Sequence, residues 1–333
     1  MKINGDPLVS IVIPVYNRES FINDAIRSSI RQTYKNIEIV IVDNCSTDNT
    51  WEVLKSWADK DHRIRIFQNS YNIGPVRNWE RCFNEAKGEF VKILWSDDWM
   101  DDNFVEEAVK LMDKDTAFVM SSTDVVYNNG HIYFSFLFGE KEMTSHFYLN
   151  EMLYIRGLNF PVSPGCALFR TKDVQESLIL AVPNSDGLDS SMNGAGNDLL
   201  LYLVIANKYA KIKTIPTVLN YFRAHKDSIS LSSNIGVFYE WARLYFVETI
   251  QKDVRKLPII KGWCNGYEGI ENYLHSVSLV SLEYLKFWCI MNTREYNASE
   301  KNRLLDMMSY PKAFVLSIPL FLRTFLGRFG QKQ

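Results

Sequence analysis

The sequence predicts an α/β fold in which a mostly parallel central sheet has helices on both faces and is followed by a helical C-terminal extension. Short β-branched runs alternate with helix-length segments over the first hundred residues, as in parallel strands joined by crossover helices. Polar residues follow directly after several of these runs. The 333 residues are 47% hydrophobic and 23% charged, so the chain is globular and long enough to bury a sizeable core.

The first strand is predicted at Val9–Val15, where apolar β-branched residues dominate. Ser20 is of a residue type that caps helices, and we expect the helix after it to run to about Gln32. A second apolar run, Ile37–Val42, stops abruptly at Asp43. These residues therefore predict one complete strand, helix and strand unit.

The same alternation continues through the next two units. Thr47 or Asp48 can cap a second helix, and Ile64–Phe67 is predicted to be the third strand. Pro75 suits the first position of a third helix, and Gly88 suits the point where that helix stops. The pattern predicts that the connections between these strands are right-handed crossovers.

The fourth strand, predicted at Glu89–Leu94, leads to the adjacent carboxylates Asp97 and Asp98. Asn17 and Asp43 also follow strands, and the carboxyl ends of parallel strands meet at one sheet edge, where open α/β folds bind ligands. Mg²⁺ and Mn²⁺ commonly take one or two carboxylates together with substrate phosphates, so the pair predicts a cation site. The alternative is that the pair forms the polar first turn of a helix.

The second half alternates less regularly. Strands are expected at Phe118–Tyr127 and Ile132–Phe138, because the turn Asn128–Gly130 between them is a strong hairpin signal. Asp198 comes directly before the apolar helix Leu199–Ala206. A helix N-terminus would hold this carboxylate ionised, and the alternative is an ordinary helix cap.

A cationic segment follows a short strand expected at Ile212–Ile215. Arg223, His225 and Lys226 lie close together in the sequence. They predict a positively charged edge of the site that can contact phosphates, and a solvated surface loop would explain them too. From about Asn234 onward the pattern is helical and rich in aromatic residues.

The C-terminal segment Pro311–Gln333 has an apolar run with basic flanks. Such a segment suits shallow insertion among anionic lipid headgroups, and it is too short to span a bilayer. The alternatives are a helix docked on the protein body and a contact between subunits, so homo-oligomerisation stays open. We expect the segment to bring the protein to a membrane surface.

Composition excludes several classes of protein. A net charge of −2 argues against a nucleic-acid partner, and the five cysteines have no CxxC spacing, which favours a reducing compartment over structural zinc. The first strand begins close to the N-terminus without a secretory leader, so we expect a cytoplasmic protein, peripheral on the inner face of the membrane. There is no GxGxxG or P-loop signature for dinucleotide binding or ATP hydrolysis.

Several ordered motifs together resemble the family 2 glycosyltransferases of bacterial surface-polysaccharide type, which have the Rossmann-like GT-A fold. The motifs are Val9–Asn17, Ile41–Asp48, Asn72–Gly74, Arg77–Asn78 and Ser96–Asp98, with a looser match through Asn197–Asp198 to about residue 230. The resemblance implies an inverting transfer of a sugar from a nucleotide diphosphate donor, usually a UDP-sugar, to an acceptor hydroxyl. It also implies a divalent cation, Mg²⁺ or Mn²⁺.

The resemblance assigns a role to each matching residue. For donor binding it implies Pro14, Tyr16, Asn17, Glu19, Asp43, Arg77, Asp97 and His225, with Asp98 as the metal ligand. Within this set Asp43 would accept a hydrogen bond from the base, and His225 would touch the diphosphate or the metal. Asp198 matches the catalytic base. Two positions depart from the family pattern, because Trp95 and Asn197 stand where acidic residues are frequent, and both departures put metal affinity in doubt.

The leading hypothesis divides the chain into three parts. Residues 1–120 would bind the nucleotide sugar, residues 121–232 would bind the acceptor within the same domain, and residues 233–333 would form the helical, membrane-associating region. The acceptor would be a lipid-linked glycan in O-antigen or capsule synthesis. The alternatives are a nucleotidyltransferase on a related fold and a non-catalytic scaffold that binds a partner through a decayed donor pocket.

Overall fold

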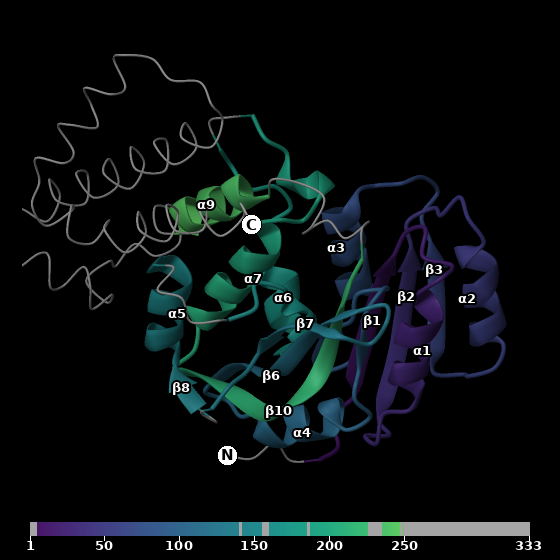
Figure 1. The fold of residues 1–333 in the computed structure, drawn as a ribbon, viewed down its shortest axis with the longest axis horizontal. Coiled ribbons are helices and arrows are strands. Elements are labelled where there is room, and N and C mark those ends of the chain that lie inside the picture. Colours follow the sequence, from purple (N-terminus) through teal and green to yellow (C-terminus); the bar gives the residue numbers. More distant parts are fainter. Residues whose placement is uncertain are drawn as a thin grey trace, which may run out of the picture. The chain divides into compact units, whose positions relative to one another are not determined.

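Parallel strands form the N-terminal half of a ten-stranded central sheet (Figure 1). In this half β1 lies between β2 and β4, and β3 pairs with the far side of β2. The predicted series of parallel strands is therefore confirmed, and the carboxyl ends of these strands share one edge of the sheet. The strands are β1 (Val9–Val15), β2 (Ile37–Asp43), β3 (Ile64–Gln68) and β4 (Phe90–Ile93).

The other half of the sheet is mixed. β9 runs antiparallel to both β4 and β6, whereas β6 and β10 are parallel to each other. The predicted hairpin forms between β6 and β7, around the turn Asn128–Gly130. The strands are β5 (Trp99–Met100), β6 (Thr116–Tyr127), β7 (Ile132–Phe136), β8 (Glu142–Thr144), β9 (Ala167–Arg170) and β10 (Lys211–Ala224).

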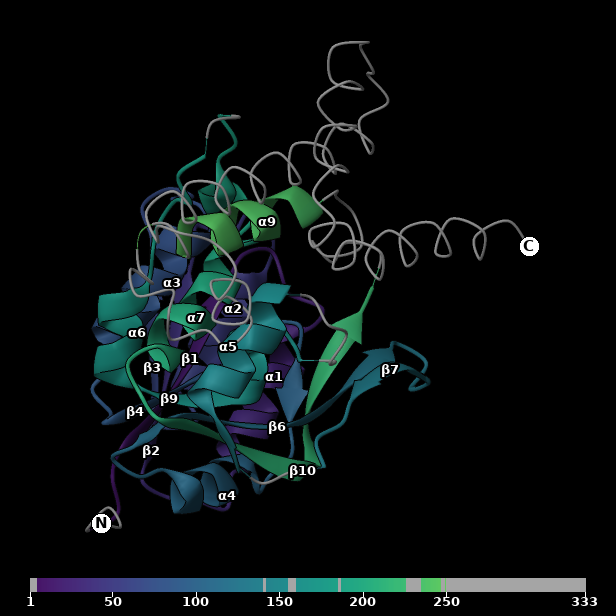
Figure 2. The same ribbon diagram turned by 90° about the vertical axis from the view of Figure 1, so that its left-hand side faces the viewer.

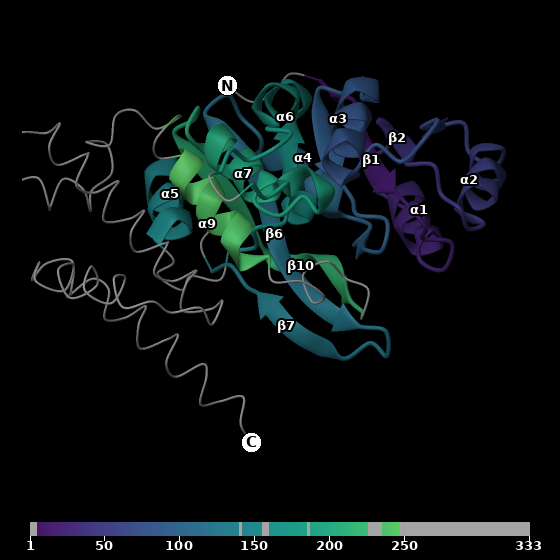
Figure 3. The same cartoon turned by 90° about the horizontal axis from the view of Figure 1, so that it is seen from above.

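Helices cover both faces of the sheet, as Figures 1 and 3 show. Alternate side chains of β1 enter two different cores, so that Ile11 packs with Leu54 on one face and Val12 packs with Phe83 on the other. The first face carries α1 (Ile22–Ile30), α2 (Thr50–Ala58) and α4 (Phe104–Leu111). The second carries α3 (Pro75–Glu85), α5 (Ser145–Tyr154), α6 (Thr171–Ser177), α7 (Asn197–Ala206) and α9 (Gly236–Tyr245).

This computed structural model describes residues 5–139, 142–154, 160–184, 187–225, 235–246 and 249. All of them belong to one unit, Met1–Trp263. The predicted membrane-associating segment Pro311–Gln333 lies outside the described residues, and so does most of the predicted helical extension. Within the described part, no helix has the length and apolar character that crossing a bilayer requires.

Two expectations about the elements are wrong. Ser20 does not cap α1, because that helix begins at Ile22 after Phe21 and has no side-chain cap. The strand expected at Ile212–Ile215 is only the first part of β10, which pairs with β6 as far as Ala224. Proline normally interrupts a strand, but here register shifts around Pro216 let the pairing continue beyond it.

Gly88 lies between α3 and β4 in a place with no room for a side chain. A Cβ atom there would lie 2.7 Å from the backbone oxygen of Leu8 and from the backbone nitrogen of Ser10. The backbone N–H of Gly88 also donates to the hydroxyl of Ser10 at 2.8 Å. The sequence predicted that this glycine marks the end of α3. The close packing of the Gly88 backbone against β1 is a second reason why this position has no side chain.

We therefore expect Gly88→Ala to lower the free energy of unfolding by about 1–3 kcal/mol, since backbone atoms cannot yield as a flexible side chain can. Gly139→Ala is the matched control, because a Cβ atom there would meet nothing within 4 Å. Denaturant unfolding of both variants checks the prediction. Equal stability of the two variants would contradict it.

Candidate active site

Two adjacent carboxylates, Asp97 and Asp98, lie in the turn after β4 at the carboxyl edge of the sheet. Asp98 is buried, and its Oδ1 accepts a hydrogen bond from the backbone N–H of Arg223 at 2.8 Å. Burial and the negative charge of Asp97 raise the pKa of Asp98. The turn thus concentrates negative charge where little water reaches it, which favours a bound cation.

The nitrogen-bearing side chains of Arg18, Arg223 and His225 surround Asp97. Its Oδ2 lies 3.0 Å from Nε2 of His225 and 3.4 Å from Nε of Arg18, and its backbone oxygen accepts from Nε of Arg223 at 2.8 Å. Burial alone would raise the pKa of Asp97, but the hydrogen bond from His225 and the charge of Arg18 lower it. The structure therefore brings three of the predicted site residues, Asp97, Asp98 and His225, together.

Aromatic rings hold Arg223 and His225 in place. The guanidinium carbon of Arg223 lies 4.7 Å from the centroid of the Trp99 ring, and Trp99 stacks on Tyr221. His225 stacks on Phe21 with ring centroids 5.0 Å apart. The alternative of a solvated surface loop is thus wrong for the described part of the cationic segment, because these side chains face the carboxylates and are not directed into water.

The loops that follow β1 and β2 are bound to each other. Oδ1 of Asn17 accepts from the backbone N–H of Thr47 at 2.8 Å, and Oε2 of Glu19 accepts from the backbone N–H of Asn49 at 2.9 Å. Asn17 has a φ of 51°, a left-handed conformation that asparagine tolerates better than most residues. Tyr16, in the same loop, is 39% exposed and available to a ligand.

Pro14 and Asp43 are placed differently from the other predicted donor-binding residues. Pro14 is buried within β1, and Asp43 is fully buried at the end of β2. The Asp43 carboxylate accepts hydrogen bonds from Ser46 and from Nε2 of Gln68, the latter at 2.9 Å. The structure therefore gives Asp43 a role in fixing the β2–α2 loop, and its contact with a nucleotide base stays a prediction.

A buried network of asparagines sets the start of α3. Nδ2 of Asn69 donates to Oδ1 of both Asn44 and Asn78 at 2.8 Å, and Nδ2 of Asn78 donates to the backbone oxygen of Val42 at 3.0 Å. The side-chain amides satisfy one another's hydrogen-bonding groups inside the protein. The network therefore fixes the position of α3 relative to β2. Arg77 lies in the first turn of α3, so the position of this helix determines where the Arg77 side chain lies.

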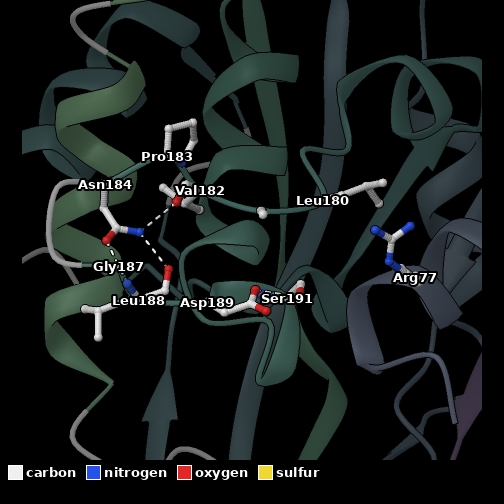
Figure 4. Close-up of a pocket in the computed structure, with 10 residues that line it drawn as sticks. Arg77, Leu180, Val182, Pro183, Asn184, Gly187, Leu188, Asp189 and Ser191 are labelled. Carbon is white, nitrogen blue, oxygen red and sulfur yellow. Dashed lines mark hydrogen bonds between the residues drawn. The ribbon is translucent and has the colours of Figure 1, made fainter.

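Arg77 lines a pocket of about 430 Å³ between α3 and the segment before α7 (Figure 4). The opposite side of the pocket carries Asn184, whose amide is bound to the backbone oxygens of Val182 and Leu188. Hydrogen bonds from Ser191, together with the charge of Arg77, lower the pKa of Asp189 in the same pocket. The guanidinium of Arg77 is exposed, as a group that binds an anionic ligand must be.

Asp198 lies in the first turn of α7. Its Oδ1 accepts from the backbone N–H groups of Gly196 and Leu199 at 2.9 and 2.7 Å, and its Oδ2 accepts from the hydroxyl of Tyr239 at 3.0 Å. Burial raises its pKa to about 7 despite these hydrogen bonds, which favour the ionised form. A carboxylate with a pKa near neutrality is suited to take up and release a proton.

A line of contacts links Asp198 to the carboxylate pair. Trp95, two residues before Asp97, packs on Trp79 of α3 with ring centroids 5.0 Å apart. A Cβ atom on Gly194 would lie 2.2 Å from the Trp79 ring, so the segment before α7 lies directly on that indole. The backbone oxygen of Gly194 accepts from the N–H of Asp198 at 3.2 Å. Trp95 is thus part of the packing that holds the two acidic groups in one region.

Lys92 is fully buried in β4 beneath the carboxylate pair. Its ammonium binds the backbone oxygen of Gly165 and, at 2.7 Å, Oδ1 of Asn220, and it lies 4.4 Å from the Phe104 ring. Burial lowers its pKa to about 7. The network joins β4, which leads to Asp98, to β10, which carries Arg223.

The carboxylate pair fits a hard divalent cation. It supplies two adjacent oxygen donors, and a cation would offset the negative charges that raise the pKa of Asp98. The described residues contain no group of three or more His, Cys, Asp or Glu side chains arranged around a metal. The protein would therefore provide only part of the coordination, and substrate phosphates and water would provide the rest.

Sequence reasoning missed two residues of the site. Arg18 directly follows the motif that ends at Asn17. A positively charged residue just after a strand at the ligand-binding edge of the sheet was a signal that could have predicted its place in the site. Tyr239 lies 41 residues from Asp198, and no local pattern points to their contact. Long-range contacts of this kind become visible only once the helices are placed.

A sequence model described as Glycosyl transferase family 2 matches residues 10–178, more than half of the chain. The chain belongs to glycosyl transferase family 2. The match contains the β1 and β2 loops, α3 and the carboxylate pair. Asp198, His225 and Tyr239 lie beyond it, so their roles depend on the geometry described above.

Related glycosyltransferases match parts of this family 2 chain. An uncharacterized glycosyltransferase of Haemophilus influenzae is 36% identical over 32% of this chain and 42% of its own length. Glycosyltransferase GlyA of Streptococcus pneumoniae is 31% identical, and the match covers 53% of this chain and 24% of that protein. The Escherichia coli UDP-Glc:alpha-D-GlcNAc-diphosphoundecaprenol beta-1,3-glucosyltransferase WfaP is 28% identical over 67% of this chain and 80% of its own length. The chain thus spans less than half of the first two relatives.

A solved structure has the same fold. Staphylococcus aureus TarS, residues 1–349 in complex with UDP-GlcNAc, superposes with a TM-score of 0.55 and 21% sequence identity, over 71% of this chain and 66% of that one. The fold of this family 2 chain is therefore GT-A, as the family resemblance implied.

The contact between Tyr239 and Asp198 gives a prediction about acidity. Tyr239→Phe removes a hydrogen bond that stabilises the ionised carboxylate, so we expect the pKa of Asp198 to rise above its value of about 7. Carbon-13 NMR titration of the Asp198 carboxyl measures this change. Tyr245→Phe on the same helix is the control, and a Tyr239→Phe titration that matches this control would contradict the prediction.

Proposed function

We propose that this family 2 chain transfers a sugar from a nucleotide diphosphate donor, a UDP-sugar, to a hydroxyl of a lipid-linked glycan in surface polysaccharide synthesis, of O-antigen or capsule type. The observation that carries the proposal is that a line of contacts links two kinds of acidic group. Asp97 and Asp98 are adjacent after β4, and Asp198, whose pKa is raised to about 7, lies at the start of α7 and is linked to them through Trp95, Trp79 and Gly194.

The relatives support the choice of substrates. The name of the Escherichia coli relative includes a UDP-glucose donor and a diphosphoundecaprenol acceptor, and the TarS structure holds UDP-GlcNAc. A UDP-sugar and a lipid-linked glycan are therefore the substrates that we assign to this chain. We further propose that the protein works at the cytoplasmic face of a membrane, because a lipid-linked acceptor is held there.

Asp198 would act as the general base. An ionised carboxylate within hydrogen-bond reach can take the proton from the acceptor hydroxyl while the hydroxyl attacks the sugar carbon. The bond between that carbon and the diphosphate breaks in the same displacement, so the configuration is inverted. Three hydrogen bonds fix the carboxylate, and its position therefore needs no reorganisation during the reaction.

Asp97 and Asp98 would hold Mg²⁺ or Mn²⁺, which when bound stabilises the negative charge that develops on the leaving diphosphate. Arg18 already contacts Asp97, and its positive charge would add to this stabilisation, while the contact with His225 would hold Asp97 in position. Arg77 would bind the nucleotide from the first turn of α3. The predicted donor residues Tyr16, Asn17 and Glu19 would line the pocket through the joined β1 and β2 loops.

The role of Asp198 predicts a specific loss of turnover. Asp198→Asn should lower the rate of UDP release in the presence of acceptor by about 100-fold or more, because a general base contributes about that factor. Folding should survive, since the amide keeps one oxygen acceptor. Asp115→Asn, at an exposed carboxylate, is the control. Unchanged turnover in Asp198→Asn would remove the proposed base.

The pKa of Asp198 also predicts how turnover depends on pH. Only the ionised carboxylate accepts a proton, so kcat/KM should fall as the pH decreases through about 7. The fall in kcat/KM on the acidic side of the profile should move to higher pH in Tyr239→Phe, because the ionised form of Asp198 is less stable in that variant. A profile that is flat between pH 5 and about 8 would contradict this assignment.

Asp98 predicts metal-dependent donor binding. Calorimetry of UDP binding with and without Mn²⁺ should show that Asp98→Asn removes the metal-dependent part and weakens binding by about tenfold or more. Asp102→Asn is the control, because Asp102 lies in the same acidic stretch but forms an exposed ion pair with Arg31. Equal metal dependence in native protein and Asp98→Asn would exclude Asp98 as a ligand.

A further inference from the structure

The ribbon formed by β6 and β7 exposes an unusual amount of apolar surface. Its outer part, residues 125–139, contains no Asp, Glu, Lys or Arg. Of the nine large hydrophobic residues that are exposed in the described part of the chain, five lie between 127 and 137. Ile132, Tyr133 and Leu137 are each more than half exposed. Contiguous patches of this kind mark interaction sites.

Apolar side chains lie on both faces of this ribbon. Val125 pairs with Phe134 and Val126 pairs with Ile132, with an irregularity between the two pairs. Consecutive residues of β6 point to opposite faces, so Phe134 and Ile132 do as well. Both are exposed. A docked protein normally covers one face of a ribbon, whereas a hydrocarbon environment accepts apolar groups on both.

The free edge of the ribbon lacks the usual protection. In the described residues β7 pairs only with β6, and Figures 2 and 3 show the ribbon projecting from the body of the sheet. Soluble proteins normally place charges or proline on such an edge to prevent association. Here the outer strand reads Ile132-Tyr133-Phe134-Ser135-Phe136, with neither. We therefore infer that this edge of the ribbon contacts another molecule or surface.

The ribbon is continuous with the candidate active site. β10 carries Arg223, which pairs in register with Val126, and Ala224 pairs with Tyr127. Nη1 of Arg223 also lies 3.5 Å from Oδ1 of Asn128 in the turn of the ribbon. Whatever covers the ribbon thus lies beside the strand that supports Asp98.

We propose that the β6–β7 ribbon is a membrane-binding surface that inserts shallowly into a lipid bilayer. The lack of charged residues in its outer part, residues 125–139, and the apolar side chains exposed on both faces favour hydrocarbon over a protein groove. Tyr127 and Tyr133, whose ring centroids are 5.2 Å apart, have polar hydroxyls suited to the headgroup level. The insertion is shallow because the unpaired backbone groups of β7 must keep contact with water.

This surface would bring the active site to a lipid-linked acceptor. That consequence rests on the proposed function, whereas bilayer binding itself does not. The ribbon differs from the basic C-terminal segment in the lipid it needs, because a segment with basic flanks favours anionic lipids and a ribbon whose outer part carries no charged residue does not.

The test is sedimentation of the full chain with vesicles of pure phosphatidylcholine at high salt, where attraction between charges is screened. The variant I132S/Y133S/L137S should bind with an affinity about tenfold or more below that of the native chain, because three exposed apolar side chains are lost. The control Y71S/F147S also removes two exposed apolar side chains, but outside the ribbon, and should bind like the native chain.

Three results would overturn the proposal. The ribbon variant could bind neutral vesicles as well as the native chain does. Light scattering could show a native oligomer that the variant dissociates, in which case the ribbon pairs with a second copy. The native chain could ignore the vesicles while the variant melts at a lower temperature, in which case the chain itself covers the ribbon.

A separate measurement distinguishes this proposal from the proposed function. With a water-soluble glycan acceptor and no vesicles, the ribbon variant should turn over a UDP-sugar at the native rate, since its three substitutions lie outside the donor and base residues. If the native chain transfers no sugar to any acceptor but still binds neutral vesicles through the ribbon, the proposed function fails and the membrane surface stands.

Discussion

The site depends on one electrostatic constraint, which is that two adjacent carboxylates are held at the end of β4 with little access to water. Like charges at this distance repel, and burial makes the repulsion stronger. The protein compensates with a backbone N–H from β10, the ion pair to Arg18 and the contact with His225. These contacts come from the loop after β1 and from the end of β10, so β1, β4 and β10 must be assembled before the pair is stable.

The N-terminal half was predictable because its signals are local. Each signal lies within a few residues of the element that it predicts. The signals are apolar runs of strand length, the proline that starts α3, and the acidic residues at the end of β2 and after β4. The hairpin at Asn128–Gly130 was predictable for the same reason. His225 lies 3.0 Å from Asp97, and its contact with the diphosphate or the metal stays a prediction.

The rest depends on pairing between distant segments. The sequence near Pro216 indicates the end of a strand, but pairing with β6 carries β10 on to Ala224 and turns a predicted loop into part of the site. Asp43 has the same sequence context as Asp97, yet it is fully buried because Ser46 and Gln68 surround it. The sequence predicts a strand at Ile132–Phe138, and only the position of β7 at the sheet edge shows that Ile132, Tyr133 and Phe134 are exposed.

A crystal structure of the protein with a UDP-sugar and Mn²⁺ is the most direct test of the central claim, that the carboxylate pair and Asp198 serve one bound donor. The account predicts that the metal joins Asp98 to the diphosphate. It also predicts a sugar carbon close enough to Asp198 for a hydroxyl placed between them to be within hydrogen-bond reach, about 3 Å, of the carboxylate. A donor whose diphosphate lies away from Asp97 and Asp98, or whose sugar is directed away from Asp198, would contradict it.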